Sequence, residues 1–181
     1  MPAFFLTFLA VAAAMLAGKD AVRVARLRVA LGWGGPLLAT VLVAALAGAG
    51  LAAWIADGLS PLIPSGFKPL VVAIALGLAG LEVLLRSASA KPKEPTRSVG
   101  AITLVLLLGM VTDASGFIIL SIAIATGEPL FAAAGGALGA IVVLVGAIIA
   151  AEDWQHLPRK LLRYGVGGGL LVVALAIALL N

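Results

Sequence analysis

Asp113 is the residue with the strongest chemical implication in this sequence, because it stands alone in an apolar stretch. Fifteen uncharged residues precede it and fourteen follow it. In a membrane-spanning helix it would lie about 20 Å from either end, close to the bilayer centre. A carboxylate at that depth costs on the order of several kcal/mol unless it is protonated, paired or hydrated. We therefore predict that Asp113 exchanges protons or binds a cation.

Two hydroxyl side chains lie close to this carboxylate in the sequence. Thr112 and Ser115 could add oxygen ligands, and such hard donors suit a cation or its partial water shell. A structural alternative stays open, in which a protonated Asp113 hydrogen-bonds a neighbouring helix and has no role in transport.

Asp20 occupies the corresponding place in the first half of the chain. Each aspartate is followed sixteen residues later by a proline, Pro36 or Pro129, and the same offset of 93 residues aligns Gly34 with Gly127. A shared register of Asp, Gly and Pro is hard to obtain by chance in so apolar a sequence, so it indicates an internal duplication. Asp20 is accordingly the fourth candidate metal ligand.

Basic residues next to Asp20 leave its role open between ligand and counter-ion. Lys19 precedes it and Arg23 follows at i+3, where either could form an ion pair with it. Glu82 stands four residues before Arg86, and this spacing predicts an ion pair on a helix surface.

The composition places the chain in the membrane class. Hydrophobic residues make up 63% and charged residues 11%, and the mean hydropathy is +1.22. The absence of Cys excludes disulfides and thiolate metal sites. Short basic loops are typical of topology determinants, so the high pI does not indicate nucleic-acid binding. No pairing of a nucleophile with a base is apparent, and we predict neither an enzyme nor a tightly bound cofactor.

Six apolar segments predict an all-α integral membrane protein with six transmembrane helices in two inverted three-helix repeats. They span residues 2–31, 35–55, 69–85, 98–126, 129–151 and 161–180. The predicted organisation is one membrane domain, formed by residues 1–86, a cytoplasmic linker at 87–97, and residues 98–181. The first segment of each repeat would be about 45 Å long as one helix, more than the hydrocarbon thickness, so a bend near each aspartate is expected.

Basic residues cluster in the first, third and fifth connections, which the positive-inside rule places in the cytoplasm. Both termini are then predicted to face outward, in a multi-pass protein of a bacterial inner membrane. Two small-xxx-small pairs, Gly135 with Gly139 and Gly165 with Gly169, predict close helix packing within the monomer or across a homodimer.

This layout resembles the cation/proton exchangers of the transmembrane protein 165 family, within the lysine-exporter superfamily. That family carries Glu-x-Gly-Asp-Lys/Arg-Ser/Thr once per half, followed by an apolar half-helix and a Gly-x-Pro turn. The second half here reads Met110-Val-Thr-Asp113-Ala-Ser115, then Gly127-Glu-Pro129. The first half reads Ala17-Gly-Lys-Asp20-Ala-Val22, then Gly34-Gly-Pro36. Both copies keep the Asp and lack the motif's Glu and its base.

The resemblance implies exchange of Ca²⁺ or Mn²⁺ for protons, and the sequence accordingly predicts proton-coupled divalent cation export. Efflux of a small organic or amino-acid-like solute is an alternative, because a mixed-charge site suits such a cargo. A membrane protein that kept the fold and only binds a partner is an alternative of another class. The expected partners are the lipid bilayer and the transported ion or solute.

Overall fold

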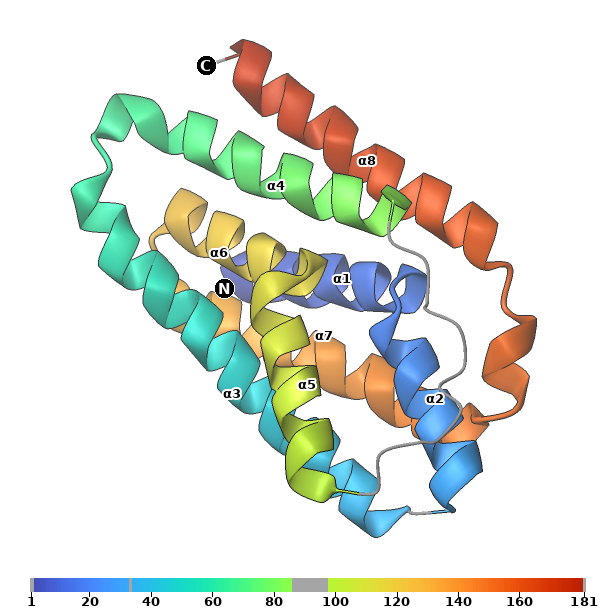
Figure 1. The fold of residues 1–181 in the computed structure, drawn as a ribbon. Helices are drawn as coiled ribbons and strands as arrows, with labels where there is room; N and C mark the ends of the chain where they lie inside the picture. The colour runs from blue at the N-terminus through green and yellow to red at the C-terminus, as the bar shows by residue number, and fades with distance from the viewer. Residues whose placement is uncertain (1, 33, 86–97, 181) are drawn as a thin grey trace.

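The computed structural model describes residues 2–32, 34–85 and 98–180 of the chain (Figure 1). Within these ranges the protein is all-helical and contains no strand. The eight α-helices are α1 (Pro2–Ala17), α2 (Asp20–Leu31), α3 (Gly35–Leu59), α4 (Lys68–Leu85), α5 (Val99–Thr112), α6 (Ala114–Thr126), α7 (Pro129–Ala150) and α8 (Arg159–Leu180). Short 3-10 turns occupy Ser60–Leu62, Ser65–Phe67 and Asp153–His156. The predicted linker at 87–97 and Arg86 lie outside the described residues.

The helices are compatible with a multi-pass membrane protein. In the described part of the chain four of them are long and apolar enough to cross a membrane, and up to six spans result if each bent pair counts as one. Large apolar side chains cover much of the outer surface, such as Leu46 at 60% and Ile149 at 80% exposure. An exterior of this kind is suited to lipid.

Both predicted bends are present. Helix α1 ends at Ala17 and α2 begins at Asp20, with 59° between them, and α5 and α6 meet at Asp113 with an angle of 46°. After each pair the chain turns through a left-handed glycine, Gly32 (φ 68°) or Gly127 (φ 67°), whose N–H donates to a helix carbonyl. The sequence register had aligned Gly34 with Gly127, but Gly34 has a φ of −84°, so the first-half turn begins two residues earlier.

Glycine lets two helix pairs pack closely. A Cβ at Gly135 of α7 would lie 2.2 Å from the Phe4 carbonyl oxygen of α1, and one at Gly139 would lie 2.6 Å from that of Phe8. The predicted close packing is thus confirmed for this pair of glycines. Gly165 and Gly169 of α8 instead have no atom within 4 Å of a Cβ position, so within the described chain they do not pack.

Helix α8 lies beside α4 (Figure 1), and few of its side chains are buried. Gly80 and Gly167 meet at the crossing, where a Cβ on Gly80 would lie 2.9 Å from the Gly167 carbonyl oxygen. Near the start of α8, Arg163 donates to the carbonyl oxygens of Val83, at 3.1 Å, and Leu84. A cation at a helix C-terminus satisfies carbonyls that have no partner within the helix.

We expect Arg163→Gln to lower the stability of the protein by about 1–3 kcal/mol, because two hydrogen bonds to a charged donor are lost. Unfolding of the purified protein in detergent micelles measures the change. Lys160→Gln is the matched control, since Lys160 is exposed on the same turn of α8 and should leave the unfolding midpoint unchanged. Equal midpoints for the two variants would contradict the capping role.

Candidate functional site

The candidate site lies where the two helix breaks come together. Asp113 adopts an extended conformation (φ −97°, ψ −177°) between α5 and α6, and Asp20 occupies the first turn of α2. Each carboxylate is therefore carried at the N-terminus of a half-helix, where the helix dipole favours negative charge. Both aspartates are 6% exposed. The break in the backbone thus places each acid in the interior at the end of a helix that stabilises it.

The two aspartates approach one another across α5. A methyl group built at Gly109 would lie 3.4 Å from Oδ2 of Asp113 and 3.5 Å from Oδ2 of Asp20. These are ordinary contact distances, so both carboxylates border the same point on the backbone of α5. Residues 93 positions apart in the sequence therefore belong to one site.

Lys19 joins this site to a third carboxylate, from α4. Its Nζ lies 2.8 Å from Oδ2 of Asp113 and 3.2 Å from Oε1 of Glu82. Arg23 pairs separately with Asp20, at 3.0 Å between Nη1 and Oδ1. The side chains of Lys19 and Glu82 are each 12% exposed, so the ion pairs are largely removed from solvent. At such burial a charge that loses its partner is strongly destabilising.

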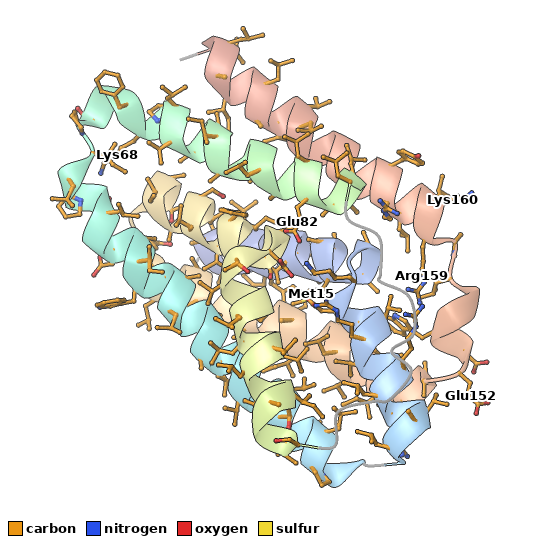
Figure 2. The ribbon with its side chains drawn as sticks, in the orientation of Figure 1. Met15, Lys68, Glu82, Glu152, Arg159 and Lys160 are labelled. Atoms are coloured by element: carbon orange, nitrogen blue, oxygen red, sulfur yellow. The ribbon has the colours of Figure 1, made fainter. Side chains whose placement is uncertain are left out.

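A small cavity of about 30 Å³ lies among these charges, large enough for about two water molecules. It is lined by Ala14, Met15, Gly18, Lys19, Asp20, Glu82, Val83, Asp113, Ala114 and Ser115. Figure 2 places Met15 and Glu82 inside the bundle, with α4 and α6 beside them. Three carboxylates against Lys19 and Arg23 leave one excess negative formal charge at the site.

Most of the site residues predicted from the sequence belong to the cavity in the structure. Asp20, Asp113, Ser115 and Lys19 line the cavity, and Arg23 reaches it through its ion pair with Asp20.

Thr112 does not line the cavity. It is exposed, and its hydroxyl donates to the Leu108 carbonyl at 2.8 Å. Ser115 donates to the Met110 carbonyl at 3.4 Å, a long bond that leaves its oxygen free to accept.

Glu82 is the cavity residue that the interpretation of the sequence missed. Arg86, its predicted partner, lies outside the described residues. The predicted position on a helix surface is wrong, because the Glu82 side chain is largely buried and pairs with Lys19. The sequence of α4 nevertheless contains a pattern that indicates a buried position for Glu82. Ala75 and Ala79 precede it by seven and three residues, which places Glu82 on the small-residue face that neighbouring helices can approach.

The cavity is not a ready-made metal centre. Among the residues that the structure describes, no three or more His, Cys, Asp or Glu side chains are grouped so that they could hold a metal ion. Lys19 lies within ion-pair distance of two of the three carboxylates. Chemically, the arrangement is a buried ion-pair network with a small space beside it. Comparison of the chain with protein-family models, curated proteins and solved structures finds no match.

Proposed function

We propose that this protein is a secondary transporter of the bacterial inner membrane that exports a cation in exchange for protons, with the cavity between the helix breaks as its binding site. The observation that carries this proposal is the convergence of Asp20, Glu82 and Asp113 on one cavity in an apolar bundle. Carboxylates are costly at such a position and are typical of ion and proton pathways. Two broken helices that meet at a cavity are also typical of transporter binding sites.

An inverted repeat of three spans is part of the proposal. The order of elements supports it, because a bent helix pair followed by two long helices occurs in each half of the chain. Each half also has an aspartate at the bend, a left-handed glycine after it and a proline at the start of the next helix. Alternating access would move the two halves against one another around the paired aspartates.

Charge distribution supports the proposed topology. Figure 2 shows Arg159 and Lys160 at one end of the bundle and Lys68 at the other. The α3–α4 and α6–α7 connections lie at the upper left of Figure 1, and the α2–α3 and α7–α8 connections lie at the lower right. With the more basic end in the cytoplasm, both termini face outward, as the positive-inside rule requires.

Manganese and calcium are the cargoes that we propose to test first. Oxygen ligands from carboxylates and the Ser115 hydroxyl suit such hard cations, and the resemblance to the transmembrane protein 165 family points the same way. The ammonium of Lys19 among the carboxylates favours a second candidate, a small amino-acid-like solute that carries both charges. That cargo would need a much wider cavity than the 30 Å³ present.

Uptake into proteoliposomes tests the proposal. We expect Mn²⁺ or Ca²⁺ to accumulate when the lumen is acidic relative to the bath, and accumulation to collapse when a protonophore removes the gradient. Empty liposomes provide the baseline. Accumulation of an amino acid without either metal would favour the second candidate. If neither ions nor solutes move and the purified protein retains one stoichiometric partner, transport is refuted in favour of a structural role.

A further inference from the structure

We propose that Lys19 is a resident counter-ion that occupies the cargo position when no cargo is bound, and that a divalent cation displaces its ammonium group. This inference rests on the proposed function and identifies the specificity-determining residue of the same site. Its motivation is geometric. The Lys19 ammonium lies between Asp113 of the α5–α6 break and Glu82 of α4, two of the carboxylates that would ligate a cation.

The place of Lys19 in the fold allows such a displacement. Lys19 lies in the short break between α1 and α2, with Gly18 before it, and is not held within a helix. Its side chain joins three separate elements, since its backbone belongs to the α1–α2 break and its partners belong to α4 and the α5–α6 break. Release of the ammonium therefore breaks contacts between elements without requiring a helix to unwind.

Charge counting explains why the ammonium and a cation should exclude one another. With Lys19 in place, the five charged groups leave one excess negative charge. With Lys19 withdrawn, Asp20, Glu82 and Asp113 against Arg23 leave two, which one divalent cation neutralises. A second cation within about 4 Å of the ammonium would be strongly repelled at low dielectric.

Binding of Mn²⁺ to the purified protein, measured by equilibrium dialysis in detergent, tests this inference. We expect Lys19→Gln to bind Mn²⁺ at least about tenfold more tightly than the wild type, since one competing charge is removed. Glu82→Gln should bind at least about tenfold more weakly, because a ligand charge is lost. The double variant restores the wild-type charge and should return towards the wild-type Kd. Lys68 contacts Ser60 and does not line the cavity, so Lys68→Gln should leave the Kd for Mn²⁺ unchanged.

The tighter binding is the decisive result, because damage to the structure would weaken binding instead. If the wild type binds and transports Mn²⁺ but Lys19→Gln binds it equally or more weakly, the proposed role of Lys19 is wrong and the proposed function remains intact. Binding by Lys19→Gln but not by the wild type supports Lys19 as occupant even without flux. Should Lys19→Gln not fold, the double variant and Glu82→Gln decide, because they differ only at Lys19, and an equal Kd in these two variants refutes the inference. If neither the wild type nor any variant binds Mn²⁺, both this inference and the proposed metal transport are wrong.

Discussion

Proton-driven Mn²⁺ uptake by Asp113→Asn should be about 100-fold below that of the wild type, since removal of one partner from a buried charge pair costs about 2–5 kcal/mol of binding. The substitution keeps the size and shape of the side chain but removes its charge. Asp113 is 6% exposed and lies 2.8 Å from Lys19, so little solvent is available to compensate. The loss affects cargo and coupling together, because the same carboxylate is the proposed ligand and the proposed proton acceptor.

Asp57→Asn is the matched control for this experiment. Asp57 is an exposed carboxylate near the end of α3 and does not line the cavity. Its flux should equal that of the wild type in the same vesicles, at equal protein density. If Asp113→Asn transports Mn²⁺ as fast as the wild type, the cavity is not part of the transport pathway, and any transport must use another site.

Gly135→Ala should strongly lower the stability of the protein, because it overpacks the helix interface between α1 and α7. The added Cβ would lie 2.2 Å from the carbonyl oxygen of Phe4 and 2.9 Å from its carbonyl carbon. Both atoms belong to the backbone, which cannot rotate away as a side chain could, so the helices must separate. Overpacking of this kind costs about 1–3 kcal/mol, and we expect the upper part of that range. Thermal unfolding in detergent micelles measures it.

At one glycine of α8 we expect the same substitution to have the opposite effect on stability. Gly168 has no atom within 4 Å of its Cβ position. Gly168→Ala should therefore raise stability by up to about 1 kcal/mol, through the higher helix propensity of alanine. If Gly135→Ala is as stable as Gly168→Ala, the two helices do not pack as closely as described here.

Hydropathy and isolated charges were enough to predict the helices and their breaks. Long apolar runs predict spans because lipid offers no hydrogen bonds to an open backbone. The length of each first segment and its single buried acid predicted the bends, which the structure places at Lys19 and Asp113. These features are local, since they depend on one stretch of chain and on its solvent.

The details of the site depend on contacts between stretches far apart. Glu82 and Lys19 are 63 residues apart, and no periodicity in either stretch indicates which partner each would take. The extended residue at Asp113 also interrupts the helical periodicity. For this reason Thr112 and Ser115, which appear equivalent beside Asp113, point to different surroundings, and only Ser115 reaches the cavity.

The bent pairs also have an electrical consequence. Their half-helices contain 16, 12, 14 and 13 residues, or about 18–24 Å each at 1.5 Å per residue, less than the hydrocarbon thickness of about 30 Å. Under the proposed topology, the cavity at their junctions lies part-way through the membrane potential. A divalent ion bound at half depth would experience about 2.3 kcal/mol per 100 mV. If the site binds a cation as proposed, the bends would make its occupancy sensitive to voltage as well as to cation concentration.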